Sequence, residues 1–199
     1  AYLSINDSRV KVADFSVGSG GLLVAAYRRK RSLLKRNLSQ ETHKQFVEED
    51  LLGVDVMPFA ANTAACHLAL QSPQYFTNKV KVAVWDSTDL SPGKTIPSVA
   101  DLRHVLSGQT FIDFFSGKKS EKKGVVSLHN GKSEDIKLEK SDLVIMNPPF
   151  TRHERIFDEY KTLLYDRFRK YDKYLAGQMG YYGYFVLLAD RFLNKGGRM

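Results

Sequence analysis

Short apolar runs alternate with helix-like segments along this chain of 199 residues, and that order is the strongest constraint on its fold. The runs that have the composition of buried strands are 9–15, 48–56, 79–86 and 142–146. Helix-like stretches follow at 18–36 and 59–71, and aromatic-rich helices then lead to a turn at 194–197. Such alternation is typical of a parallel sheet with crossover helices. The sequence therefore predicts an α/β fold with a doubly wound, mostly parallel, Rossmann-like sheet.

The chain suits one domain with one sizeable core, and its 43% hydrophobic and 26% charged residues are typical of a globular protein. Residues 91–140 are rich in Gly, Ser and Lys, with short apolar pieces at 111–115 and 124–128. We interpret them as an irregular insertion within a single domain that spans 1–199. The last two residues would begin a fifth strand, so we expect the outer strands to be missing and the domain to be truncated at both ends.

The charge balance favours a polyanionic partner, nucleic acid first, because the net charge is +8 and the pI about 9.5. No apolar run approaches the ~20 residues that span a bilayer, so no membrane association is expected. A single cysteine, Cys66, excludes an internal disulfide framework and suits a reducing, cytoplasmic location. Without a C-x-x-C or H-E-x-x-H motif, no metal site is predicted.

A glycine-containing loop joins the first strand to the first helix. Val17, Gly18 and Gly20 stand there, after Asp14 at the end of the strand. Glycines let the backbone pass close to a ligand, and a helix N-terminus offers free N–H groups to an anion. The spacing matches only part of the dinucleotide pattern G-x-G-x-x-G, because position 23 is Leu. Taken alone, the loop fits a ligand site and a plain tight turn equally well.

An acidic residue ends each of the first three strands: Asp14, Asp55 and Asp86. In nucleotide-binding halves of this kind, an acid after the second strand accepts bonds from ribose hydroxyls. The separation of Gly18 and Asp55 exceeds the usual ~20 residues because a basic, polar stretch at 28–49 intervenes. Asx turns and helix caps also place Asp at strand ends. Together, however, the three acids favour a ligand that carries adenosine.

The fourth strand stops abruptly at Asn147-Pro148-Pro149-Phe150. Two adjacent prolines remove two backbone donors and fix two φ angles, so neither a strand nor a helix continues through them. The result is a rigid corner between an amide and an aromatic ring. The alternative is a simple strand-ending turn with Phe150 in the core.

With segments 14–21, 51–58, the strand that ends at Asp86, and Asn-Pro-Pro-Phe in this order, the chain resembles S-adenosylmethionine-dependent N6-adenine DNA methyltransferases of restriction–modification systems. The resemblance covers most of residues 9–199. It implies the class I methyltransferase fold, S-adenosylmethionine as cofactor and double-stranded DNA as partner.

The resemblance gives the corner a chemical role. The Asn147 side-chain oxygen and the Pro148 carbonyl would each accept one N6–H bond from adenine, and Pro149 would keep the corner stiff. Phe150 would stack on the base after it is flipped out of the duplex. Because a sulfonium already activates the methyl group, the family's reaction involves no metal or covalent intermediate.

The resemblance also assigns the cofactor contacts. Backbone around Val17, Gly18 and Gly20 would surround the methionine part of the cofactor, and Asp14 would face its amino group. The family more often has Pro and a small residue after this Asp, where the chain has Phe15 and Ser16.

On the adenosine side, Asp55 would hold the ribose hydroxyls and Asp86 the adenine amine of the cofactor. Met57 and Pro58 would line the face of that adenine. These assignments complete the set of cofactor residues that the resemblance implies.

Arg152 and His153 follow the corner directly, so they are candidates for nucleic-acid contacts. Cytosine C5 methylation requires a nucleophilic cysteine after a proline, whereas Cys66 lies within a predicted helix, where we expect it to pack. The segment between Asp86 and Met146 is too short for a complete recognition domain. We therefore expect a fused recognition domain, a specificity subunit or a restriction subunit as an additional partner.

Three alternatives stay open. N-P-P-aromatic corners also serve RNA guanine-N2 methyltransferases and protein glutamine methyltransferases, because an amide or an exocyclic amine poses the same geometric problem. The chain could instead be a non-catalytic scaffold that grips nucleic acid or a partner subunit. An intact corner argues against a scaffold, which would gain nothing from it.

Overall fold

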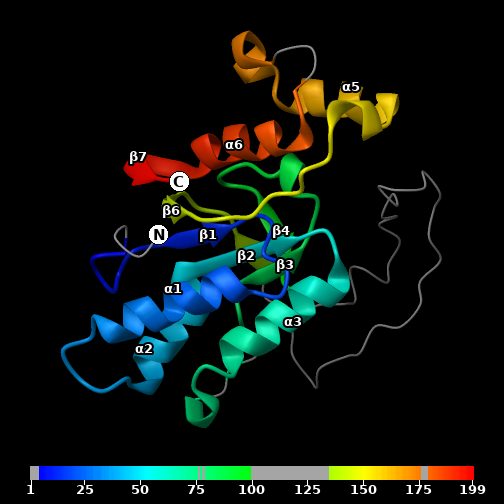
Figure 1. Ribbon diagram of the computed structural model, residues 1–199. Coiled ribbons are helices and arrows are strands. Elements are labelled where there is room, and N and C mark those ends of the chain that lie inside the picture. The colour runs from blue at the N-terminus through cyan, green and yellow to red at the C-terminus, as the bar shows by residue number, and fades with distance from the viewer. Residues whose placement is uncertain (1–4, 76, 78, 100–134, 176–178) are drawn as a thin grey trace.

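The computed structural model describes residues 5–75, 77, 79–99, 135–175 and 179–199 (Figure 1). A five-stranded sheet in the order β3-β2-β1-β6-β7 forms its centre, and every pairing in it is parallel. Its strands are β1 (Val12–Asp14), β2 (Leu51–Asp55), β3 (Val82–Val84), β6 (Ser141–Val144) and β7 (Leu193–Arg198). The chain builds outward from β1 to β3, then crosses to β6 and continues to β7. This Rossmann-like arrangement confirms the predicted fold class.

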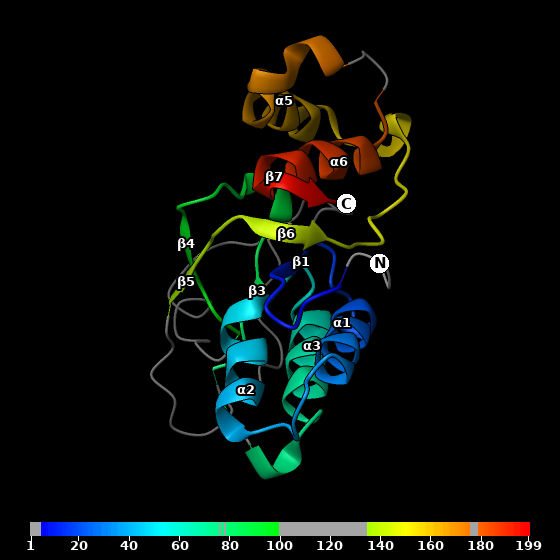
Figure 2. The same cartoon turned by 90° about the vertical axis from the view of Figure 1, so that its left-hand side faces the viewer.

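Helices cover both faces of the sheet, and Figure 2 shows the strands between two helical layers. One layer holds α1 (Gly21–Ser32), α2 (Gln40–Lys44) and α3 (Pro58–Ala69), and the other holds α5 (Asp158–Arg167) and α6 (Tyr181–Phe192). The remaining helical turns, of the π or 3-10 type, are η1 (Gln45–Asp50), η2 (Pro73–Tyr75), η3 (Ser87–Asp89), η4 (His153–Arg155) and η5 (Arg169–Tyr174).

Successive side chains of a strand point to opposite faces of the sheet, so each helical layer has its own core. Val12 packs with the α1 and α3 layer, whereas Ala13 belongs to the cluster that contains Phe185 and Phe192 of α6. This is the two-residue period of a strand that is buried on both faces. Phe185 and Phe192 of α6 therefore pack against this face of the sheet, whereas Tyr182 of the same helix is exposed.

The turn from β1 into α1 depends on Gly20. Its φ is +87°, in the left-handed region that favours glycine. A Cβ at this position would lie 2.9 Å from the Ala64 Cα, a contact with backbone that cannot move aside easily. The absence of a side chain thus lets the start of α1 approach α3 closely.

The predicted boundaries around the second strand are wrong at two points. The first helix ends at Ser32 rather than at 36, and residues 48–50 belong to the π-helical turn η1 rather than to a strand. Phe46 and Asp50 lie about one turn apart and both are buried. Asp50 is buried because the Lys30 ammonium lies 2.9 Å from its carboxylate, and both side chains are almost inaccessible. The buried ion pair therefore holds this segment in a helical turn.

The expected turn at 194–197 is also wrong, because these residues lie within β7. Ser141 pairs with Leu193 and Leu143 with Arg198, so the longer β7 segment is accommodated by a shift in register. Gly196 has a φ of +82° in this irregular part. Glycine thus allows a bulged strand here instead of ending the element.

Two short strands lie within the predicted insertion, outside the main sheet. β4 (Thr95–Pro97) and β5 (Asp135–Lys137) pair antiparallel, and Ile96 and Ile136 face each other in a buried contact. The apolar pieces at 111–115 and 124–128 lie outside the described residues. Within the described parts of the chain, no helix is both long and apolar enough to cross a membrane.

Candidate active site

The predicted site residues come together at the carboxyl edge of the sheet. Asp14 ends β1, Asp55 ends β2, and Asp86 and Asn147 follow β3 and β6 closely. Because all these strands are parallel, their carboxyl ends meet at one edge (Figure 1). The order of connection reverses between β1 and β6, and ligands of open α/β sheets bind at such a switch point.

Backbone hydrogen bonds tie the glycine loop to the end of β2. The Gly18 N–H donates to Asp55 Oδ2 at 2.9 Å, and the Val17 N–H donates to the Val54 carbonyl at 3.0 Å. The Met57 N–H donates to Asp55 Oδ1 at 2.9 Å. Each oxygen of this half-buried carboxylate thus accepts one backbone bond and keeps lone pairs for further donors.

Asp14 is the most buried of the strand-end acids, at 1% exposure. Its Oδ1 accepts from the Ser16 N–H at 3.0 Å, whereas the buried Oδ2 has no hydrogen-bond partner among the described residues. Burial raises the pKa of Asp14 to about 7, and the nearby Asp55 charge adds to this effect. An unpartnered buried oxygen of this kind provides a place for a cationic donor.

Apolar side chains stand exposed where α3 begins. Met57 precedes the helix, Pro58 is its first residue, and Phe59 follows. Met57 is 56% and Phe59 84% exposed, so this helix start offers an apolar surface beside Asp55. Phe59 was not among the predicted site residues. Its place directly after the proline that starts the helix could have indicated that it belongs to this apolar surface.

The corner after β6 stands out from the sheet. The Ile145 N–H still donates to the Ala13 carbonyl at 2.9 Å, but Asn147 and Pro149 are exposed. Among the described residues, the Asn147 amide has no hydrogen-bond partner. Phe150 is 75% exposed, which excludes the alternative that its ring belongs to the core. The corner therefore presents an amide and an aromatic ring to solvent.

The segment beyond the corner is anchored to α6. The Tyr181 N–H donates to the Thr151 carbonyl at 2.9 Å. Arg152 is exposed, and His153 is half-buried, with its Nδ1 buried and without a partner among the described residues. The bond between Thr151 and Tyr181 therefore ties the backbone just before Arg152 and His153 to the start of α6.

Asp86 makes the densest set of contacts at this edge. Its carboxylate accepts from the Thr88 backbone and hydroxyl, is approached by the Tyr160 hydroxyl, and forms an ion pair with Arg167. Tyr160 and Arg167 belong to α5 and were not predicted. They lie with buried Leu164 on one face of that helix, at the i, i+4, i+7 spacing that could have revealed them.

Cys66 does not pack as expected, because it lies exposed on α3. Cys66 lies on the outer face of this helix, whereas its neighbours Ala64 and Ala65 face the core and are buried. The described residues contain no group of three or more His, Cys, Asp or Glu side chains arranged to hold a metal ion.

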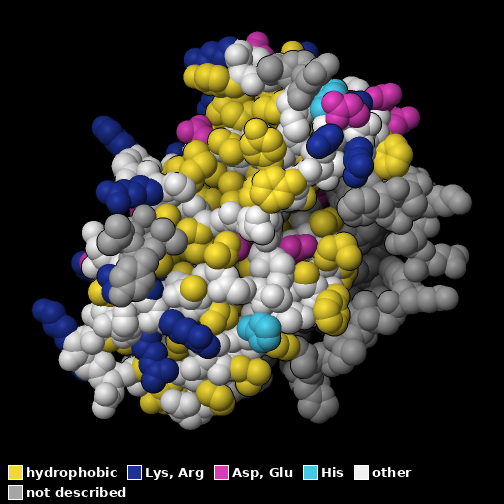
Figure 3. Space-filling view, viewed as in Figure 1, with side chains coloured by type: hydrophobic (Ala, Val, Ile, Leu, Met, Phe, Trp, Pro, Cys, Tyr) yellow, Lys and Arg dark blue, Asp and Glu magenta, His cyan; other side chains and the backbone are white. Residues whose placement is uncertain are grey.

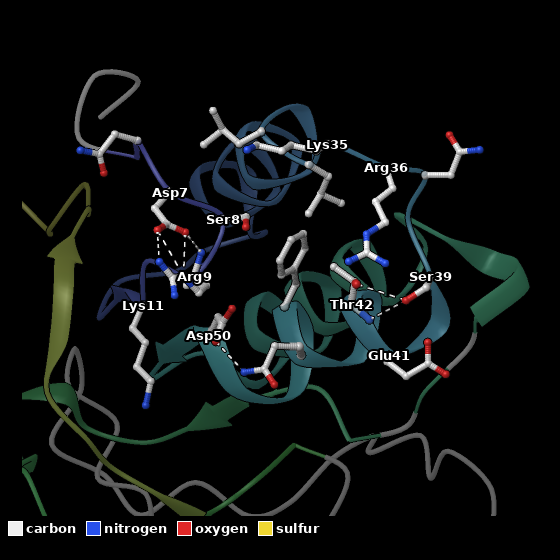
Figure 4. Close-up of a pocket in the computed structure, with 16 residues that line it drawn as sticks. Asp7, Ser8, Arg9, Lys11, Lys35, Arg36, Ser39, Glu41, Thr42 and Asp50 are labelled. Atoms are coloured by element: carbon white, nitrogen blue, oxygen red, sulfur yellow. Dashed lines mark hydrogen bonds and ion pairs between the residues drawn. The ribbon is translucent and has the colours of Figure 1, made fainter.

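The opposite, amino edge of the sheet holds a hollow between the start of β1 and the end of α1 (Figure 4). Several of its charges are paired within the chain, since Arg9 bonds to Asp7 and Lys11 lies 2.6 Å from Glu139. Basic side chains gather on this side of the molecule in Figure 3. The predicted site residues lie at the other edge, so this hollow is no part of the candidate site.

A family model, Eco57I restriction-modification methylase, matches residues 49–199, which is more than half of the chain. The chain belongs to this family. It is therefore a restriction–modification methyltransferase whose substrate is DNA, in agreement with the resemblance drawn from its motifs. The matched region includes Asp55, Asp86 and the Asn147 corner. No curated protein matches the chain.

Proposed function

We propose that this chain transfers a methyl group from S-adenosylmethionine to the N6 amine of adenine in DNA, with the base flipped out of the duplex. The observation that carries the proposal is the Asn147-Pro148-Pro149-Phe150 corner, whose amide and aromatic ring are exposed and which shares the carboxyl edge of the sheet with the strand-end aspartates. Family membership independently supports DNA methylation.

The residues at this edge fit S-adenosylmethionine, which supplies a methyl group activated by its sulfonium. The unpartnered Oδ2 of Asp14 accepts from the ammonium of the methionine part, beside the Val17, Gly18 and Gly20 backbone. A positive charge at that point lowers the pKa of Asp14 from its value of about 7 and so keeps the carboxylate ionised.

The adenosine part meets the ends of β2 and β3. The remaining lone pairs of Asp55 accept from ribose hydroxyls, in line with the role of such an acid in related sheets. The exposed Met57 and Pro58 offer an apolar surface to one face of the adenine. Asp86 accepts from its amine.

The corner supplies the acceptors for the substrate. The N6 amine of adenine is a poor nucleophile because its lone pair is delocalised into the ring. The Asn147 amide oxygen and the Pro148 carbonyl each accept an N6–H bond and direct the nitrogen lone pair toward the methyl group. The Asn147 amide gives up no bond to another described residue on binding, and Pro148 and Pro149 restrict the backbone. The acceptors are thus oriented before the base arrives.

Phe150 and the residues after it supply the remaining contacts. An exposed ring stacks on the flipped base and offsets part of the cost of unstacking, which is a few kcal/mol. Arg152 and His153 contact phosphates of the strand that carries the base. Sequence recognition comes from a fused domain or from a specificity or restriction subunit, in a cytoplasmic complex.

DNA is favoured over RNA guanine and protein glutamine because the matching family methylates DNA. The exposed amide and ring argue against a scaffold, in which such groups would have no use. The catalytic reading also accounts for the unpartnered oxygen of Asp14, which a scaffold leaves without a function.

Modified-base sequencing of DNA from cells that express the parent gene tests the proposal. We expect N6-methyladenine in a defined motif, lost with Asn147→Ala and retained with Asn37→Ala, an exposed asparagine at the amino edge. N4-methylcytosine in place of N6-methyladenine would contradict the base assignment. An unmethylated genome would contradict the proposed activity.

A further inference from the structure

We propose that Arg167 is a positioning residue for cofactor recognition: it fixes the Asp86 carboxylate so that one oxygen keeps a single acceptor position for the exocyclic amine of the cofactor's adenine. This inference rests on the proposed use of S-adenosylmethionine. It assigns a role to a side chain of α5, a helix that follows the corner in the sequence and packs against the turn η3 after β3.

The first oxygen of Asp86 is fully used within its own turn. Oδ1 accepts from the Thr88 N–H at 3.1 Å and from the Thr88 hydroxyl at 2.8 Å. A carboxylate oxygen has two lone pairs, so these two bonds occupy both. They also fix the rotation of the side chain, because Asp86 caps the turn η3.

The second oxygen has one strong partner. Arg167 Nη1 pairs with Oδ2 and also donates to the Thr88 hydroxyl oxygen at 2.7 Å. The ion pair is largely removed from water, since the exposed fractions of the two side chains are 20% and 19%. One lone pair of Oδ2 is then left for another donor.

The Tyr160 hydroxyl now approaches that remaining position, but only weakly. It lies 3.3 Å from each oxygen of Asp86, which is longer than the usual 2.5–3.0 Å of an O–H···O bond. Burial and the Asp86 charge raise the pKa of Tyr160 to about 12, so at neutral pH it has one proton to donate. The Tyr181 hydroxyl oxygen, at 3.0 Å, and the Thr88 hydroxyl oxygen, at 3.1 Å, compete with Asp86 as acceptors for this Tyr160 proton. An amine donor can therefore replace Tyr160 at Asp86 at little cost.

Both the guanidinium and the backbone carbonyl of Arg167 are themselves held in place. Its Nε lies 3.7 Å from Asp89 Oδ1, so the guanidinium bridges two carboxylates. Its carbonyl accepts from Arg191 Nη2 at 2.9 Å, and Arg191 also donates to the Leu90 carbonyl at 2.8 Å. A planar, charged fork fixed in this way orients a carboxylate more strictly than a flexible ammonium does.

The proposal is distinct from a purely structural ion pair. If Arg167 only held α5 on the sheet, its loss would weaken every cofactor analogue to the same extent. If Arg167 positions the acceptor for the amine, its loss weakens only ligands that carry the amine. Selectivity between two such ligands is therefore the informative quantity.

The test is calorimetric binding of S-adenosylhomocysteine and of its inosine counterpart, in which a carbonyl replaces the amine. We expect the wild type to prefer the adenosine ligand by about tenfold or more, the effect of one hydrogen bond to a charged group. Arg167→Gln lowers the ratio of the two affinities toward one, because it weakens the binding of the adenosine ligand alone. Arg167→Lys restores part of it, and Arg169→Gln, at an exposed neighbouring position, leaves it unchanged.

Each other outcome overturns the inference. An unchanged preference in a folded Arg167→Gln protein, equal weakening of both ligands, or tighter binding of the adenosine ligand would show that Arg167 does not position the acceptor. A wild type that binds both ligands equally would remove the role of Asp86 on which the inference depends. A wild type that binds neither would refute the proposed cofactor as well, and thermal melting of each variant separates these results from misfolding.

Discussion

The strongest prediction concerns Asp14, because replacing this acid should change how stability depends on pH. In the unfolded state the Asp14 carboxyl has its ordinary pKa of 3.8, whereas burial in the folded state raises this pKa to about 7. Between these values the folded state binds more protons than the unfolded state. Stability therefore falls as the pH rises from about 4 to about 7.

The size of the effect follows from the same two values. Raising the pKa from 3.8 to about 7 corresponds to about 4 kcal/mol, at about 1.36 kcal/mol for each pH unit. Asp14→Asn removes the titration and keeps an oxygen to accept the Ser16 N–H. We expect the variant to match the wild type near pH 4 and to exceed its free energy of unfolding by several kcal/mol at pH 8.

Urea denaturation of both proteins at intervals between pH 4 and pH 8 measures this difference. The difference in the free energy of unfolding should grow steadily up to about pH 7 and then level off. Parallel curves across the whole range would refute the reasoning, since they would mean that Asp14 ionises at its ordinary pKa in the folded protein. A difference that grows as the pH falls would refute its sign.

Further predictions concern the cofactor, the packing of the loop, the buried pair and the corner. Because a bound ammonium requires ionised Asp14, calorimetry should show wild-type affinity for S-adenosylhomocysteine falling from pH 8 to pH 5.5, with Asp14→Asn weaker at pH 8 and less pH-dependent. Gly20→Ala should cost about 3 kcal/mol in urea denaturation through its positive φ and the Ala64 contact, whereas Gly21→Ala, with nothing within 4 Å, should be neutral or slightly stabilising. Lys30→Met should cost about 3–5 kcal/mol by leaving Asp50 buried and unpaired, and adding Asp50→Leu should recover part of that loss. Phe150→Ala should leave stability within about 0.5 kcal/mol and reduce DNA methylation about tenfold to hundredfold, and Leu70→Ala, at a similarly exposed position, should leave both unchanged.

The features that the sequence predicts well depend on local patterns. Apolar runs located all four expected strands of the sheet, and the acids and glycines at their ends lie at the carboxyl edge, where we propose that the ligands bind. Burial on both faces gives a parallel strand a continuous apolar run, which needs no knowledge of distant residues. The corner is equally local, because proline restricts its own φ and the residue before it.

The errors arise where a distant partner decides the structure. Residues 48–50 form a helical turn because Asp50 pairs with Lys30, and no pattern near position 50 announces that partner. Arg167 reaches Asp86 across 81 positions of sequence, so its contact follows only from the packing of α5 on the sheet. Glycines at 196 and 197 are typical of a turn, yet a bulged strand uses the same conformational freedom.

Residue type alone does not distinguish the roles that we propose for the three strand-end aspartates. Asp14 is buried with an unpartnered oxygen, so it suits a cation that restores its charge. Asp55 accepts one backbone bond on each oxygen and keeps a lone pair on both, so it suits a pair of neighbouring hydroxyls. Asp86 has a single position left beside Arg167 and the Thr88 donors, so it suits a single N–H. An ammonium, a diol and an amine are three groups of one molecule, and we infer that the number of free lone pairs at each strand end determines which group binds there.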